Sequence, residues 1–348
     1  MKTEIITDPH EIRFPKLGWT FHIDPTAFRI GKLEIQWYGI LIALGLGLAL
    51  LYCFPKMKKR FGIDPDKAVD AVLAGIIGGI VGARAYYVAF RWEDYKGDIK
   101  AILNTRNGGL AIYGGIIGAL ICGLIFCRIK KIKMLPMLDI TVLGFLIGQG
   151  IGRWGNFTNQ EAFGTNTNSI FGMTGGTIQE TIAMNTLYTD GSMTGLGVDY
   201  LKTIHPCFLY ESVWCLLGFL ILSTYSKHRK YDGQILLMYM AWYGAERAVV
   251  EGLRTDSLMI GNIRVSQALS ACICIASVVL QIVLFFRRKR DPERFRLWAD
   301  IQNGTADAAP ETGRADKEET LTETILGEDE DTEEENISSD ENGEEPKE

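Results

Sequence analysis

Seven apolar segments constrain the fold of this chain more than any other feature of its sequence. Each is 17 to 23 residues long, and about 20 apolar residues in a helix cross the hydrocarbon core of a bilayer. Because hydrocarbon offers no partner to backbone N–H and C=O groups, such segments must satisfy those groups internally as helices. The sequence therefore predicts an all-α polytopic membrane protein with seven transmembrane helices. They occupy approximately residues 38–54, 68–90, 111–128, 135–153, 207–225, 234–253 and 264–286.

Basic residues gather in the connections that follow the first, third, fifth and seventh apolar segments. The remaining connections are mixed or acidic, as in residues 91–94. Cytoplasmic loops of membrane proteins carry an excess of Lys and Arg, so this alternation predicts an N-terminus outside and a cytoplasmic C-terminus. The four basic clusters lie within residues 56–60, 128–133, 227–230 and 287–290.

The parts outside the bilayer form three regions around a seven-helix membrane domain, residues 38–290. An extracytoplasmic arm, 1–37, shows no cleavable signal peptide, and a small extracytoplasmic head, 156–205, follows the fourth helix. Residues 301–348 hold 18 acidic and 3 basic residues, whereas the whole chain has a net charge of −6. The membrane body is therefore basic. We expect the cytoplasmic tail, 291–348, to be mostly disordered and acidic, and its plain interpretation is a solvated, dispensable extension.

The run Gly-Arg-Trp-Gly-Asn-Phe-Thr-Asn-Gln-Glu-Ala-Phe-Gly, residues 152–164, begins where the fourth apolar segment ends. Arginine, amide and carboxylate groups at the rim of a hydrocarbon segment are costly unless they have partners. The orientation places Arg153 at the outer end of its helix. An anionic lipid headgroup is therefore a candidate partner for Arg153.

The sixth apolar segment carries a second arginine at a matching depth. A rise of about 1.5 Å per residue puts Arg247 about 20 Å above the cytoplasmic end. Tyr243, Arg247 and Glu251 share one helical face because they are four residues apart. An internal Arg247–Glu251 ion pair is the simplest interpretation, but the matching depth of Arg153 favours an anion site. Two guanidinium groups suit a phosphate diester, whereas Glu246 lies about 100° away and reads as a separate structural charge.

Polar groups from six of the seven segments are expected near the outer leaflet, including those of Tyr38, Arg84, Tyr113 and Glu211. The glycine runs around residues 74–82 and 113–118 indicate close helix packing, with the exception of the Gly114–Gly115 pair beside Tyr113, where thin backbone can admit a lipid. The four histidines lack paired ligand spacing, so we expect neither a metal nor another cofactor.

Six ordered blocks resemble the bacterial phosphatidylglycerol–prolipoprotein diacylglyceryl transferase family. The most specific is residues 152–164, whereas the glycine-rich blocks are weak alone. The resemblance does not cover the acidic tail. The other blocks are QWYG at 36–39, GARAYY at 82–87, NGGLAIYGG at 107–115, HPCFLYE at 205–211 and YGAERAVVE at 243–251.

The resemblance implies transfer of the diacylglyceryl group from phosphatidylglycerol to the lipobox cysteine of prolipoproteins, forming a thioether and releasing glycerol 1-phosphate. This is the first step of bacterial lipoprotein maturation. It implies partners of two kinds, membrane lipids and prolipoprotein lipobox segments, and no nucleic acid. It also implies a bacterial cytoplasmic membrane location, with the site facing the periplasm or cell exterior. Arg153 and Arg247 match the family's essential pair, and the residues that shape the site match Tyr38, Asn156, Glu161, Gly164, Tyr243 and Glu251.

Tyr113 departs from the family pattern and is the third catalytic candidate. Many members carry a histidine there, which is a proposed base for the thiol. Tyrosine, with an ordinary pKa near 10, is a poor base near pH 7. Either Tyr113 positions the lipid or thiol, or another group takes the proton.

Two functions from other classes compete with a transferase. One is a transporter that uses the same charges as an ion path, and the other is a non-catalytic lipid-binding scaffold. Clustering at the outer leaflet, without an evident internal repeat, disfavours the transporter.

Overall fold

The computed structural model is mostly helical and describes residues 3–31, 33–105, 108–187, 197–255, 257, 259–260 and 263–304. Each of the seven predicted apolar segments forms a helix. The first four long helices are α1 (Trp37–Lys56), α2 (Pro65–Phe90), α5 (Ile112–Ile129) and α6 (Met134–Thr158). The other three are α8 (Cys207–Tyr225), α9 (Gln234–Val250) and α10 (Val265–Arg290). Of the tail predicted at 291–348 to be mostly disordered, residues 291–304 are described and include a short helix, whereas the rest, from residue 305 onward, lies outside the described residues.

Six of these helices are long and apolar enough to cross a membrane within the described part of the chain. The helix α9 has 17 residues and is the shortest of the seven. Many large apolar side chains of these helices, such as Leu51, Ile77 and Val249, are exposed on the protein surface. A polar solvent disfavours so large an apolar surface, so the helices belong to a polytopic membrane protein.

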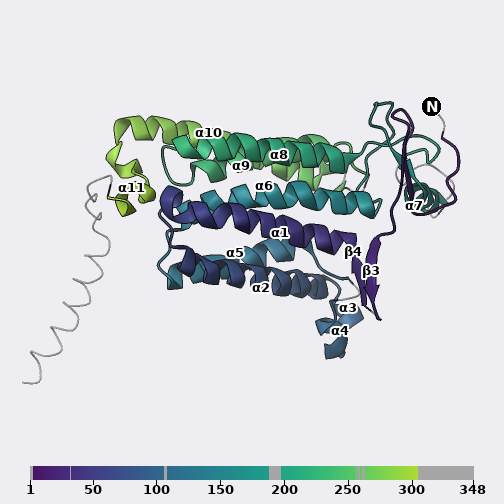
Figure 1. The fold of residues 1–348 in the computed structure, drawn as a ribbon, viewed down its shortest axis with the longest axis horizontal. Helices are drawn as coiled ribbons and strands as arrows, with labels where there is room; N and C mark the ends of the chain where they lie inside the picture. Colours follow the sequence, from purple (N-terminus) through teal and green to yellow (C-terminus); the bar gives the residue numbers. More distant parts are fainter. Residues whose placement is uncertain are drawn as a thin grey trace, which may run out of the picture. The chain divides into compact units, whose positions relative to one another are not determined.

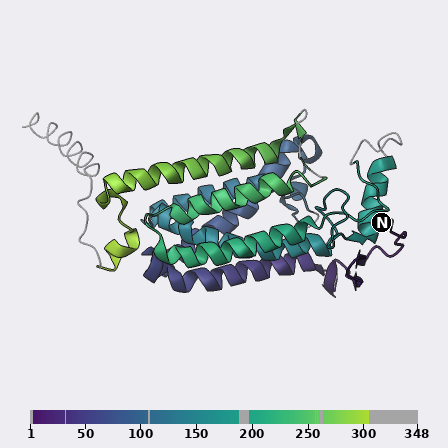
Figure 2. The ribbon, with the colours of Figure 1, turned by 90° about the horizontal axis from the view of Figure 1, so that it is seen from above.

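The long helices lie side by side in three layers (Figure 1). The pair α1 and α6 forms the middle layer, the pair α2 and α5 lies on one side, and α8, α9 and α10 lie on the other. Figure 2 shows α10 and α1 on opposite sides of the bundle. The helix α6 contacts both α8 and α9.

Glycines allow α2 and α5 to approach until their backbones touch. A Cβ built on Gly82 would lie 2.5 Å from the carbonyl oxygen of Gly114, and one on Gly78 would lie 2.7 Å from that of Gly118. The prediction of glycine packing faces is therefore confirmed. It extends to Gly114, expected as a lipid opening, because Gly114 packs against Gly82 and Tyr86.

Asp139 connects α6 to the start of α9. Its buried carboxylate accepts hydrogen bonds from the backbone N–H groups of Gly233 and Leu236, both at 2.8 Å. These N–H groups lie at the beginning of α9, where no intrahelical acceptor is available. Asp139 therefore fixes the starting point of the helix that carries Arg247.

The arm and the head fold together at one end of the bundle (Figure 1). Strand β1 (Glu11–Phe14) pairs with β2 (Trp19–His22) and with β5 (Thr174–Gly175), and α7 (Gly176–Leu187) follows β5. Side chains from both segments fill one apolar core. This core contains Ile12, Phe14, Phe157, Phe163, Met173, Ile178, Ile182, Val198, Ile204 and Phe208.

A hairpin leads into α1 at the same end. Strand β3 (Thr26–Ile30) pairs in antiparallel fashion with β4 (Leu33–Gln36). Gly31 lies at the turn with a φ of +61°, a conformation that glycine adopts without strain. The short helices α3 (Trp92–Tyr95) and α4 (Ile99–Leu103) also lie at this end (Figure 1).

The opposite end is covered by α11 (Trp298–Gln302), which follows α10. The Trp298 indole N–H donates to the carbonyl oxygen of Gly62 at 3.1 Å, and its backbone N–H donates to Asp232 at 2.9 Å. Burial raises the pKa of Asp232 and lowers that of Arg229, whose Nε lies 3.8 Å from an Asp232 oxygen. Trp298 therefore ties the segment after α10 to the connections before α2 and α9.

Candidate active site

Glu211, in the second turn of α8, is the centre of the candidate site. Its side chain is 1% exposed, and three arginines point to its two oxygens. Arg153 Nη1 lies 3.0 Å from Oε2, Arg247 Nη1 lies 2.9 Å from Oε1, and Arg254 Nη1 lies 3.8 Å from Oε2. A single buried carboxylate thus gathers guanidinium groups from α6, from α9 and from the segment after α9.

Arg247 also pairs with Glu251 one turn along α9. The Glu251 side chain is 2% exposed and contacts the second guanidinium nitrogen of Arg247. Its backbone carbonyl accepts hydrogen bonds from Arg264 and from the Ser257 hydroxyl. The shared helical face of Arg247 and Glu251 is therefore present, and the pair is part of a larger network.

The two arginine side chains remain partly exposed, although the carboxylates that hold them are buried. The side chains of Arg153 and Arg247 are 20% and 18% exposed, whereas those of Glu211 and Glu251 are 1% and 2% exposed. A guanidinium has five N–H donors, so an arginine held by a carboxylate retains donors for a second anion. The arrangement therefore presents two oriented cations to a ligand.

The signature run, residues 152–164, forms the end of α6 and a turn that folds back on it. Gln160 and Ala162 adopt left-handed conformations, with φ of 53° and 55°. The buried Gln160 side chain donates to the carbonyl of Pro9, and the Asn156 amide donates to Glu161 Oε1 at 2.9 Å. Such backbone conformations persist where the surroundings hold them in place. The turn therefore brings Asn156 and Glu161 together.

Gly164 ends the run in a place with no room for a side chain. It forms an antiparallel bridge with Arg254, and its N–H donates to the His205 carbonyl at 3.0 Å. A Cβ there would lie 2.8 Å from the Cβ of His205 and 2.9 Å from Cys207 Sγ. Burial lowers the pKa of His205 below its ordinary value. Gly164 thus joins the turn to the two segments that carry Glu211 and Arg254.

Two predicted tyrosines lie beside the arginines. A Cβ on Gly155 would lie 2.2 Å from Tyr38 Cδ2, so the Tyr38 ring fills the space against that glycine. Tyr38 interacts electrostatically with Glu161 and Arg153, and Tyr243 interacts with Arg153 and Arg247. Tyr38 is therefore associated with Arg153, and Tyr243 with both arginines.

Tyr113 and Arg84 make their contacts with other partners. The half-exposed Tyr113 places its hydroxyl 3.3 Å from that of Ser266, in the first turn of α10. The Arg84 guanidinium donates to backbone carbonyls of the 101–109 segment, at 2.7 to 3.3 Å. Arg84 therefore connects α4 to Gly108 and Gly109, and its guanidinium donors are used in these contacts.

The sequence interpretation placed Glu211 on the outer side but assigned no role to it, and it assigned none to Arg254. The available signal was a carboxylate at outer depth opposite two arginines, which needs counter-charges to be buried. Which charges it would meet depends on how α8 is rotated. Periodicity does not determine that rotation.

A pocket of about 550 Å³ opens beside the signature run, between the arm and α6. Trp37 and Leu41 of α1 line it together with Trp154 and Phe157 of α6. The Trp154 indole N–H donates to the Ser212 hydroxyl at 3.1 Å, which orients its ring. A mostly apolar pocket of this size offers a place for an apolar group of a substrate.

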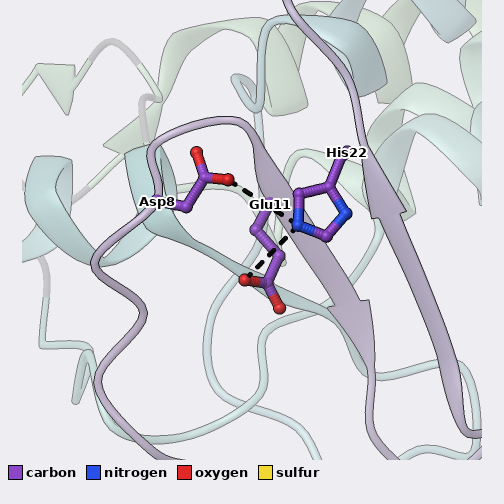
Figure 3. Close-up of side chains that lie close together, drawn as sticks. All are labelled: Asp8, Glu11 and His22. Carbon is purple, nitrogen blue, oxygen red and sulfur yellow. Dashed lines mark ion pairs between the residues drawn. The ribbon is translucent and has the colours of Figure 1, made fainter.

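Three side chains of the arm lie close enough to hold a metal ion, although histidine spacing in the sequence indicated no such site (Figure 3). His22 Nε2 lies 3.6 Å from Asp8 Oδ2 and 3.8 Å from Glu11 Oε2. Register pairing of Glu11 with His22 brings the two strands together here. The side chains of His22 and Asp8 are 62% and 42% exposed. Contacts between such surface groups are common, and no metal ion is needed to explain them.

Comparison with known proteins places most of the membrane body in one family. Residues 25–283 match the family described as prolipoprotein diacylglyceryl transferase. The chain is 45% identical over 261 residues to a Finegoldia magna protein named phosphatidylglycerol–prolipoprotein diacylglyceryl transferase, covering 75% of this chain and 95% of that protein. Proteins of the same name from Listeria innocua and Clostridioides difficile are 40% identical over 270 residues and 38% identical over 269 residues. These matches cover 78% and 77% of this chain, and 92% and 98% of the relatives. The chain therefore belongs to the prolipoprotein diacylglyceryl transferase family.

Proposed function

We propose that this chain transfers the diacylglyceryl group of phosphatidylglycerol to the lipobox cysteine of a prolipoprotein, and that Arg153 and Arg247 hold the lipid phosphate. The relatives are named for these two substrates. One observation carries the assignment of the site. Two arginines from different helices converge on the buried carboxylate of Glu211 and keep exposed donors.

The reaction needs cations where the phosphate leaves. The thiolate sulfur attacks the glyceryl carbon that is bonded to a phosphate oxygen, so a C–S bond forms and the C–O bond breaks. The electron pair of that bond stays on the phosphate, which departs as glycerol 1-phosphate. The thiol proton passes to a base in the surroundings of the sulfur. Arg153 and Arg247 stabilise the negative charge that grows on the phosphate. Glu211 and Glu251 hold the two guanidinium groups in place beforehand.

The other predicted residues shape the space around the phosphate. Tyr38 and Tyr243 are associated with the arginines, while the Asn156–Glu161 contact and Gly164 fix the turn after α6. Tyr113 contacts Ser266 of α10, and in this proposal it positions α5 against α10 while another group takes the thiol proton. The apolar pocket lined by Trp37 and Trp154 receives the apolar side chains of the lipobox.

The membrane arrangement follows from the charges. In this proposal, α9 crosses the bilayer with the other six long helices, and the N-terminus lies outside. The basic clusters around residues 56–60, 128–133, 227–230 and 287–290 support this orientation. The site then faces the periplasm or cell exterior from the bacterial cytoplasmic membrane.

A product assay tests the reaction and its arginines together. The purified chain is given phosphatidylglycerol and a lipobox peptide, and the peptide mass is followed. We expect a diacylglyceryl adduct with the cysteine peptide and none with its serine counterpart. Arg153→Ala and Arg247→Ala should each lower kcat/KM by about 100-fold or more, because each removes a donor to developing charge.

Arg91→Ala is the matched control, since Arg91 is exposed and its ion pair is with Asp94 of the same turn at 3.7 Å. It should retain wild-type activity. Absence of any thioether product, or full activity in both site variants, would contradict the proposal.

The orientation has its own test in intact cells. A membrane-impermeant thiol reagent should label Glu34→Cys, in the exposed hairpin β3–β4, without prior permeabilisation. Lys58→Cys, in the first basic cluster, should react with the reagent only after the cells have been permeabilised. The reverse labelling pattern would overturn the orientation.

A further inference from the structure

Glu246, on α9 immediately before Arg247, is a buried carboxylate without a hydrogen-bond donor. The residue is 5% exposed, and neither oxygen has a partner among the described residues. A buried polar group left unpaired costs more than its hydrogen bond would gain. An ionisable group in this state indicates a partner that arrives with a ligand.

The surroundings of Glu246 indicate which ligand. Its carboxylate interacts electrostatically with Glu211 and with Arg153, Arg247 and Arg254. Glu211 and Glu251 already have arginines on their oxygens. Glu246 is thus the carboxylate of this cluster whose two oxygens remain able to accept, and it directly precedes Arg247, one of the two proposed phosphate-binding arginines, in α9.

Phosphatidylglycerol has few groups able to donate to such a carboxylate. Its esters and phosphate accept hydrogen bonds only, and its donors are the two hydroxyls on adjacent carbons of the headgroup glycerol. That glycerol is bonded directly to the phosphate. A phosphate on Arg153 and Arg247 therefore brings the hydroxyl pair next to the same cluster, where the hydroxyls can donate to a carboxylate oxygen that has no other partner among the described residues.

We propose that Glu246 accepts hydrogen bonds from the two headgroup hydroxyls of phosphatidylglycerol and so selects the lipid that donates the diacylglyceryl group. This inference rests on the proposed function of the arginine pair. A lipid with the same phosphate and no headgroup hydroxyl leaves the carboxylate unpaired beside a negative charge. Sites built to bind a substrate hydroxyl discriminate strongly against analogues that lack it.

The test compares two donor lipids in one assay. Phosphatidylglycerol and phosphatidyl-1-propanol with identical acyl chains have the same charge and differ in the headgroup hydroxyls. The wild-type protein should use the propanol lipid with a kcat/KM at least about tenfold lower. Glu246→Gln should lower kcat/KM for phosphatidylglycerol by about tenfold and leave that for the propanol lipid within about twofold, since Gln loses one acceptor.

Glu180→Gln makes the same chemical change on the exposed face of α7 and should keep the wild-type preference. If Glu246→Gln is not recovered folded, the same comparison of the two lipids can be made with Glu246→Leu. An apolar side chain of similar size is tolerated where a buried charge stood. The ratio of the two lipids within one variant is independent of the folded fraction.

Two results would overturn the inference. An equal loss with both lipids would assign Glu246 to the chemistry or to the fold, and no loss with either lipid would remove it from headgroup binding. Failure of the wild-type protein to form a thioether from either lipid is a different result, which would contradict the proposed function itself.

Discussion

At the scale of single residues, Glu211 shows how this membrane protein tolerates buried charge. A carboxylate alone in a low-dielectric interior is strongly disfavoured, and it becomes acceptable when cations and hydrogen bonds surround it. Glu211 meets Arg153 and Arg247 at 3.0 and 2.9 Å. The same contacts orient the arginines, so the burial of one acid prepares two cations for a ligand.

Gly155 provides a prediction about packing beside the arginines. Gly155→Ala should lower the free energy of unfolding by about 1–3 kcal/mol, because the added methyl would overlap the Tyr38 ring. Thermal unfolding in detergent measures the effect. Gly47→Ala, where no atom lies within 4 Å of the built Cβ, is the control and should be near neutral. Equal stability of the two variants would contradict the close Tyr38 contact.

His205 predicts a pH dependence of stability. Burial lowers its pKa in the folded protein, so the unfolded chain binds the proton first as the pH falls through its ordinary value near 6.5. The contribution of His205 to the free energy of unfolding is therefore full above that pH. It declines as the pH falls further, until the pH reaches the pKa of His205 in the folded protein. Thermal unfolding between pH 7.5 and 5 should show a shallower acid decline for His205→Gln, while the exposed His10→Gln keeps the wild-type slope. Parallel curves of unfolding temperature against pH for wild type and His205→Gln would contradict this role of His205.

At the scale of elements, hydropathy was enough to predict where the helices lie in the sequence. It did not predict which side chains of neighbouring helices contact one another. Segments 207–225 and 234–253 became α8 and α9 with nearly the expected bounds, because length and apolarity are local properties. The Arg247–Glu251 spacing was also local. The contact of both arginines with Glu211 depends on helix rotation and crossing, which tertiary packing decides. Tyr113 was grouped with them by depth, yet it contacts Ser266.

Asp139 carries the prediction for an element. Asp139→Ala should cost about 1–3 kcal/mol of stability, because it leaves two buried N–H groups at the start of α9 without an acceptor. Activity should fall with it, since α9 carries Arg247. Asp64→Ala removes a similar but exposed cap at the start of α2 and should cost less in the same unfolding assay. A larger loss for Asp64→Ala would contradict this role of Asp139.

At the scale of the whole molecule, the described structure reaches beyond the family match. That match ends at residue 283, whereas the ordered contacts continue to α11. Built on Gly62, a Cβ would lie 2.9 Å from the Cα of Ala299, so α11 packs directly against that backbone. The arm and head close one end of the bundle, and α11 contacts the other (Figure 1).

Two truncations separate α11 from the acidic residues after it. A chain ending at residue 304 should keep the activity and Tm of the full chain, because it retains the contacts of Trp298 with Gly62 and Asp232. A chain ending at residue 291 loses those contacts and should unfold at a lower temperature. Thermal unfolding and the product assay check both. Loss of activity on ending at residue 304 would assign the acidic segment a function.

The most direct measurement of the central claim is a double-mutant cycle on the two arginines. Arg153→Lys and Arg247→Lys keep the charges and remove the paired donors, so product formation stays measurable. If both arginines bind one phosphate, the double variant should lose less kcat/KM than the product of the two single losses, by about tenfold or more. Single losses that multiply would show two independent sites and contradict the account.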